Sequence, residues 1–197
     1  MKQTLVLLLL CFISVATTHA DEDIYNPLSV GLRWEAAVDL MTPDGHVMHG
    51  TAIREITGTE IIAGQTYFKS VTRFTDIPGM TQFTTYRRKS KDGIYAINGI
   101  DPLKREYLET GLPLVAGKTW TVTTTDNEKT VFSVEPEETV TIGDRKYKKC
   151  FKVVYRSEGS SPSGFFYLAP NTGNVIETLK QGGATFKFTL KSFSSAK

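Results

Sequence analysis

The stretch Pro113-Leu114-Val115-Ala116-Gly117-Lys118-Thr119-Trp120 decides the fold, because its pattern, PLxxGxxW, occurs earlier at Pro27-Leu28-Ser29-Val30-Gly31-Leu32-Arg33-Trp34. Each copy leads into a run that is typical of a β-strand. The chain has only two tryptophans, and both lie at the last position of a copy. We therefore expect two pseudo-repeats that start near residues 27 and 113. The alternative is a coincidence among common turn residues.

Apolar and polar residues alternate through most of the chain, which is the pattern of half-buried strands. The alternation is clearest at residues 33–40 and 184–191. Turn residues separate these runs, as at Thr42-Pro43-Asp44-Gly45 and Asp92-Gly93, and we interpret Gly58 and Gly64 as breaks. The expected strands cover residues 33–40, 46–56, 66–75, 82–89, 94–98, 120–125, 130–134, 139–142, 147–156, 165–168, 175–180 and 184–191, with a weaker segment at 99–112.

No segment has the 3.6-residue periodicity of a helix, so the predicted fold is all-β or nearly so, with little helix. Each half forms an antiparallel meander that cannot cover its own apolar face. Two halves joined edge to edge or face to face close one core, and a sheet of this many strands tends to curl. We therefore predict a curved antiparallel sheet, in the form of a half-barrel.

Residues 1–20 have the features of a cleaved signal peptide. Lys2 supplies the positive charge, Leu5–Val15 form an apolar stretch too short to span a bilayer, and cleavage is expected after Ala20. An uncleaved anchor is the alternative. Cys11 does not predict a lipoprotein, because the bulky Leu10 precedes it and the apolar stretch continues past it. The expected location is the periplasm or the medium, with no membrane span after cleavage.

Residues 21–197 then form a single β-rich domain. Cys150 is the one cysteine left, so no internal disulfide is expected and stability comes from an ordinary core. Cleavage removes Lys2 from the 23 basic residues, against 21 acidic ones. This near balance argues against nucleic acid as the main partner.

The candidates for chemistry are weak, and we predict no catalytic, cofactor-binding or metal-binding residue and hence no enzyme. His46 and His49 are three apart on an expected strand and would face opposite sides, so they do not form a metal site with Asp44. Cys150 lies near lysines, but no histidine is a plausible partner for it. The simpler interpretation of this thiol is a small packed side chain.

Two further polar segments are interpreted as solvated turns. The run Gly159-Ser160-Ser161-Pro162-Ser163-Gly164 does not have the GxSxG pattern of a nucleophile elbow. Glu135, Glu137 and Glu138 flank Pro136, as in an exposed turn. The 21 aromatic residues, eight Tyr, eleven Phe and two Trp, can instead fill a core or line an apolar groove. The sequence leaves both open.

Tyr25 to Trp34, Pro113 to Trp120, the run Tyr147–Val153 and Phe166 to Gly173 resemble bacterial exported domains of unknown function grouped with the pilus-associated TapB lipoproteins. The resemblance covers nearly the whole mature chain. It implies a curved sheet similar to the LolA-type lipoprotein carriers, and no catalytic residues. Many such relatives are lipoproteins, whereas Cys11 here lacks a lipobox.

These observations favour an exported, non-enzymatic β domain of the cell envelope that binds an apolar ligand or an envelope protein. The second hypothesis is a carrier of lipid or lipoprotein acyl chains in the concave face of the sheet. A hypothesis of another class is an envelope hydrolase, which requires a polar cluster that faces a pocket.

Overall fold

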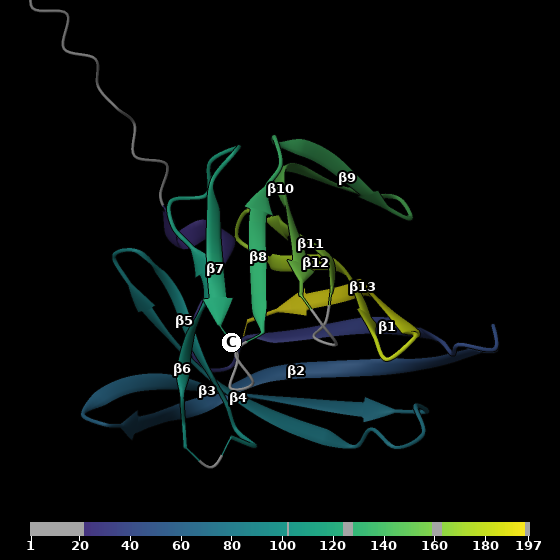
Figure 1. Cartoon of the computed structure of the whole chain (residues 1–197), viewed down its shortest axis with the longest axis horizontal. Coiled ribbons are helices and arrows are strands. Elements are labelled where there is room, and N and C mark those ends of the chain that lie inside the picture. The colour runs from purple at the N-terminus through teal and green to yellow at the C-terminus, as the bar shows by residue number, and fades with distance from the viewer. Residues whose placement is uncertain (1–21, 102, 124–127, 159–162, 196–197) are drawn as a thin grey trace, which may run out of the picture.

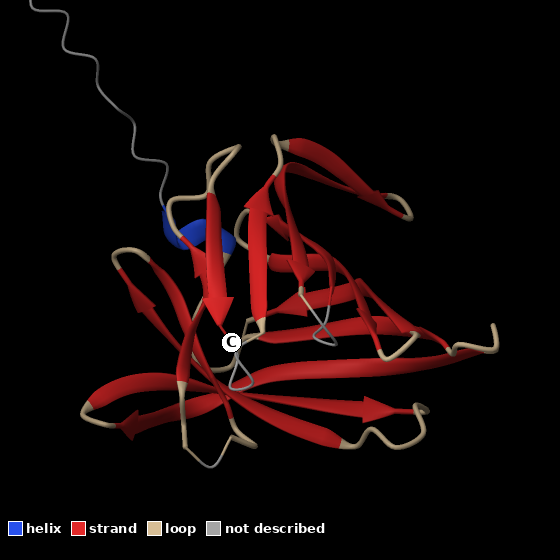
Figure 2. Ribbon diagram, viewed as in Figure 1, coloured by secondary structure: helices blue, strands red, loops and turns tan. Residues whose placement is uncertain are grey.

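The computed structural model describes residues 22–101, 103–123, 128–158 and 163–195. They form one 3-10 helix and a sheet of thirteen strands (Figure 2). The elements are η1 (Glu22–Tyr25), β1 (Arg33–Met41), β2 (Val47–Ile62), β3 (Gln65–Thr75), β4 (Gln82–Ser90), β5 (Gly93–Asn98), β6 (Glu106–Gly111), β7 (Thr119–Thr123), β8 (Lys129–Val134), β9 (Glu138–Ile142), β10 (Arg145–Ser157), β11 (Ser163–Ala169), β12 (Gly173–Gln181) and β13 (Ala184–Ser194).

The strands form two consecutive antiparallel meanders in one sheet, with the order β6-β5-β4-β3-β2-β1-β13-β12-β11-β10-β8-β7. A nine-position ladder between β1 and β13 joins the meanders. Strand β9 pairs with the first half of β10, and β8 pairs with its second half. The two outer strands, β6 and β7, come together at the opposite side (Figure 1). The sheet is therefore a nearly closed barrel.

The predicted curved, antiparallel, nearly all-β fold is confirmed, and the sheet curls further than a half-barrel. One local interpretation was wrong, since Gly58 is not a break. Strand β2 continues through it to Ile62, and the ladder with β3 is shifted between Ile56 and Gly58 by a bulge. The bulge accommodates one extra residue without ending the strand. The weak segment at 99–112 contains β6.

The two PLxxGxxW segments have the same backbone geometry. Gly31 and Gly117 have φ angles of 87° and 84°, which a glycine adopts without a steric penalty. The amide of Gly31 donates to the Ile56 carbonyl, and the amide of Gly117 donates to the Val134 carbonyl, each at 2.8 Å. Ile56 and Val134 each donate back, at 2.9 Å, to the residue that follows the glycine. Both segments are thus the same kind of corner before a strand. Descent of the two halves from one unit stays a prediction.

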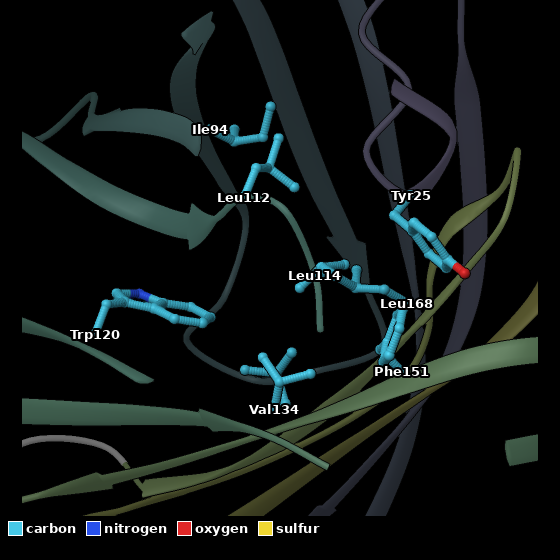
Figure 3. Close-up of a cluster of buried hydrophobic side chains, with 9 residues drawn as sticks. Tyr25, Ile94, Leu112, Leu114, Trp120, Val134, Phe151 and Leu168 are labelled. Carbon is cyan, nitrogen blue, oxygen red and sulfur yellow. The ribbon is translucent and has the colours of Figure 1, made fainter. Parts of the chain in front are cut away.

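Each corner tryptophan packs into a different part of the core. Trp120 stacks on Phe132 with ring centroids 5.0 Å apart, in a cluster that includes Tyr25 and Leu114 (Figure 3). Trp34 belongs to a second cluster and donates from Nε1 to the Thr172 carbonyl at 2.6 Å. Leu28, in the segment from η1 to β1, packs against both clusters. We call the end of the barrel that this segment covers the plugged end.

Replacing Trp120 by Ala should lower the free energy of unfolding by about 3–5 kcal/mol, because a large aromatic side chain leaves a buried cluster. Urea denaturation measures the loss. Val115→Ala, at a half-exposed position of the same corner, is the matched control and should change stability by less than about 0.5 kcal/mol. An unchanged melting temperature of the Trp120 variant, together with lost ligand binding, would contradict the structural role.

Candidate functional site

The barrel encloses a cavity of about 750 Å³, and strands of both meanders line it. Asn26, Pro27 and Leu28 border it at the plugged end. Phe83 and Ile100 also line it, yet they are 40% and 79% exposed, so the cavity reaches the surface near them. We call this region the open end.

Most of the wall is apolar, as the alternation of the strands requires of inward-facing positions. Typical lining side chains are Ala36, Phe74, Phe132, Phe166, Phe188 and Leu190. They come from β1, β3, β8, β11 and β13, so aromatic surface surrounds the cavity on several sides. The sequence left a filled core and an apolar groove open, and the structure contains both packed clusters and a cavity.

Four charged side chains line this apolar interior, namely Arg54, Arg87, Glu109 and Glu177. Arg87 on β4 forms a bidentate ion pair with Glu109 on β6, with N–O distances of 2.7 and 2.8 Å. Burial raises the pKa of Glu109, but the charge and hydrogen bonds of Arg87 outweigh it, so the pKa lies below its ordinary value. Their residual accessible surface, 16% and 25%, faces the cavity that both residues line.

Arg54, on β2, has a different environment. Its guanidinium carbon lies 4.1 Å from the centre of the Trp34 ring, a cation–π contact. Within the part of the chain that the structure describes, its guanidinium has no hydrogen bond and no salt bridge. Burial, together with the positive charge of Arg87, lowers its pKa to about 10. Arg54 is therefore still charged at neutral pH.

Glu177, on β12, is the fourth charged residue. Its Oε2 accepts a hydrogen bond from Asn174 Nδ2 at 2.9 Å. Burial raises the pKa of this carboxyl above its ordinary value, although the nearby Arg54 lowers it. The two glutamates thus shift in opposite directions, because only Glu109 has a guanidinium fork bound to it.

Sequence reasoning missed these four residues, because Arg54, Arg87 and Glu177 lie within expected strands and Glu109 lies in the weak segment at 99–112. A signal was present: Arg54 lies in phase with Ala52 and Ile56, and Glu177 lies in phase with Val175 and Leu179. A charge at an inward position of a strand is a candidate functional residue. Their convergence depends on closure of the barrel, which alternation does not encode.

The residues considered from sequence lie outside this cluster. His49 Nδ1 contacts Asp39 Oδ1 at 2.8 Å at the surface, and His46 lies in the turn before β2. Among the described residues, no group of three His, Cys, Asp or Glu can hold a metal ion. Glu135 pairs with Lys152 at 3.0 Å.

Cys150 is fully buried, and its Sγ donates to the Tyr147 carbonyl at 3.3 Å. Burial raises the pKa of this thiol, so the thiolate is disfavoured at neutral pH. Residues 159–162, which include Ser160 and Ser161, lie outside the described residues, as does the expected signal peptide.

Arg87→Met should lower the free energy of unfolding by about 3 kcal/mol, because it leaves the Glu109 carboxylate inside the barrel without its counter-charge. The double variant Arg87→Met/Glu109→Leu should recover at least half of that loss. Urea denaturation of both variants at pH 7.5 tests this. Equal losses in the single and double variants would show that the pair is not the source of the effect.

Comparisons with known proteins show the fold alone. No family model matches the chain, and no curated protein matches it significantly. A solved structure of a protein described as exported, with a YmcC-like fold, from Bacteroides fragilis is 15% identical with a TM-score of 0.51, covering 87% of this chain and 99% of its own. A β-barrel-like protein of a domain of unknown function from Brucella abortus is 12% identical (TM-score 0.45, 86% and 100% covered), and a protein described as a lipoprotein from Parabacteroides distasonis is 14% identical (TM-score 0.42, 87% and 98%).

In the described ranges, no helix is long and apolar enough to cross a membrane. In its fold, the chain is similar to a bacterial protein described as exported and of YmcC-like fold.

Proposed function

We propose that this protein is a non-enzymatic binding protein of the bacterial cell envelope that holds an acyl-chain amphiphile inside its barrel. The observation that carries the proposal is the cavity of about 750 Å³ with a mostly apolar wall. Ligand pockets of roughly 300–1,000 Å³ enclose a single small molecule. Transfer of an apolar chain from water to such a wall lowers the free energy of the system.

The two ends of the cavity support a carrier rather than a storage site. The segment from η1 to β1 covers the plugged end, while Phe83 and Ile100 expose apolar surface where the cavity reaches the outside. A chain that enters at the open end meets apolar side chains from the surface inward. We propose that the ligand passes through this end.

The likeness in fold to a protein described as exported supports a role in the envelope. The resemblance to the TapB lipoproteins stays a prediction from the sequence, and it keeps an envelope protein as an alternative partner. A protein partner would contact the outside of the barrel or its open end. It would not need the inner wall, so changes inside the cavity distinguish the two partners.

An envelope hydrolase is the candidate of another class, and one observation favours it. The raised pKa of Glu177 is a property of general acids, and this carboxyl faces a pocket. Both oxygens of the second carboxylate, Glu109, are however bound by Arg87. Such a carboxylate is poorly placed to act as a nucleophile or base, and we therefore favour binding.

The test is binding of the neutral fluorophore N-phenyl-1-naphthylamine and its displacement by 1-dodecanol. Ala36→Trp places a large side chain in the cavity, because Ala36 lines it, and should weaken fluorophore binding at least tenfold. Ala37→Trp, on the same strand but outside the cavity lining, is the matched control and should leave binding within twofold.

Equal binding by the two tryptophan variants would place the fluorophore outside the barrel and contradict the proposal. Absence of binding by the unmodified protein would contradict it as well. Circular dichroism melts of both variants confirm that each is folded before binding is measured.

A further inference from the structure

We infer that Arg54 is the anchor for the anionic head group of the ligand, which lies deep in the barrel with its chain directed towards the open end. The inference rests on the proposed function and deepens it, because it names the chemistry of the ligand and its orientation.

The first step is that the guanidinium of the half-buried Arg54 has no hydrogen-bond acceptor among the described residues. A guanidinium carries five N–H donors and no acceptor, and burial of an unpaired charge is costly. Within the described ranges, its guanidinium makes a cation–π contact with the Trp34 ring. That contact does not use the N–H groups as hydrogen-bond donors. The donors at the edge of the guanidinium are therefore available to an acceptor in the cavity.

The second step is that the neighbouring carboxylates do not fill this need. Glu109 is held by both of its oxygens in the fork of Arg87. Glu177 affects the pKa of Arg54 through its charge, but no N–O pair between them lies within the 4 Å of a salt bridge. Because Glu109 already neutralises Arg87, Arg54 is the positive charge of this cluster whose N–H donors are left for an anionic acceptor.

The third step concerns the shape of the anion. The planar fork of arginine matches a carboxylate or phosphate in a bidentate arrangement, and the cation–π contact holds the guanidinium of Arg54 over the Trp34 ring. The cavity volume suits a single acyl chain. The expected class is a single-chain anionic amphiphile, with a carboxylate or a phosphate as its head.

The fourth step gives the orientation. Ile56, two residues after Arg54, donates its amide to the Leu32 carbonyl at 2.9 Å, at the plugged end. Ala52, two residues before Arg54, packs in a cluster with Phe74 and Phe188 on the opposite side. The head group is thus next to the plugged end, and the chain extends along this aromatic cluster.

Two further polar atoms belong to residues that line the cavity near Arg54. Ser70 and Asn26 both line the cavity, and Ser70 Oγ and Asn26 Nδ2 are buried without a hydrogen-bond partner among the described residues. Buried polar atoms are nearly always satisfied in native proteins, so a small rotation of either side chain that exposes its polar atom to the cavity would gain a hydrogen bond. Ser70 faces Ile56 across the β2–β3 ladder, near Arg54.

The experiment compares three ligands of one chain length, dodecanoate, dodecyl phosphate and 1-dodecanol, by displacement of N-phenyl-1-naphthylamine at pH 7.5. The unmodified protein should bind at least one anion at least tenfold more tightly than the alcohol. Arg54→Met should reduce that preference to within twofold while binding of 1-dodecanol stays within threefold. The anion with the larger loss identifies the head group as carboxylate or phosphate.

Two variants control for charge. Arg73→Met removes a positive charge from the outer face of β3, where the side chain is 52% exposed, and should leave the preference for the anion unchanged. Glu177→Gln removes a negative charge that competes with the ligand and should tighten binding of the anion at least threefold. If Arg54→Met does not fold, Arg54→Gln replaces it.

The outcomes separate the inference from the proposed function. Unchanged preference in the Arg54 variant, or an equal loss in the Arg73 variant, overturns the anchor while 1-dodecanol still binds. A preference for the alcohol in the unmodified protein overturns it too. Failure of all three ligands to bind overturns the proposed function and the anchor together.

Discussion

The antiparallel ladder between β1 and β13 is the constraint on which the rest of the structure depends. It joins the two meanders into one sheet, so that their apolar faces lie on the same side of the sheet, towards the interior of the barrel. As the sheet curls, β6 and β7 meet and the interior is enclosed. Side chains fill a barrel of about eight strands, and its diameter grows with the number of strands. The path of twelve strands around this barrel is therefore wide enough to leave a cavity.

Closure also creates the electrostatic character of the interior. Arg54 and Arg87 lie on strands of the first meander, as does Glu109, while Glu177 lies on the second. Only the curled sheet brings Glu177 close enough to influence Arg54. Four charges inside an apolar barrel lower stability relative to an apolar core, unless each is paired. Arg87 and Glu109 satisfy this condition with each other, and Arg54 does not.

Much of the fold follows from local rules in the sequence. The alternation at residues 184–191 predicts β13, and the turn residues at 42–45 predict the β1–β2 hairpin, because side-chain period and turn chemistry are local properties. The extent of β2 was not predictable in the same way. A glycine at a bulge and a glycine at a break look alike in sequence, and Gly58 is at a bulge.

The candidate site depends on contacts that are distant in the chain. Arg87 and Glu109 meet across β5, and Glu177 comes near Arg54 from the other meander, whereas Trp34 and Arg54 are a direct pair of the β1–β2 hairpin. A polar residue in phase with buried neighbours, as at Arg54 and Glu177, indicates an inward charge but not its partner. Partners are set by strand order and curvature, which are tertiary properties. The sequence therefore indicates which residues face inward, and the structure supplies their grouping.

The central claim is that the barrel carries a single-chain anionic amphiphile. Native mass spectrometry of the protein, purified without detergent from the cells that produce it, tests it most directly. The account predicts a folded species that carries one adduct with the mass of a single-chain amphiphile, and loss of that adduct on denaturation. A folded species with no small-molecule adduct, or with a bound protein in its place, would contradict it.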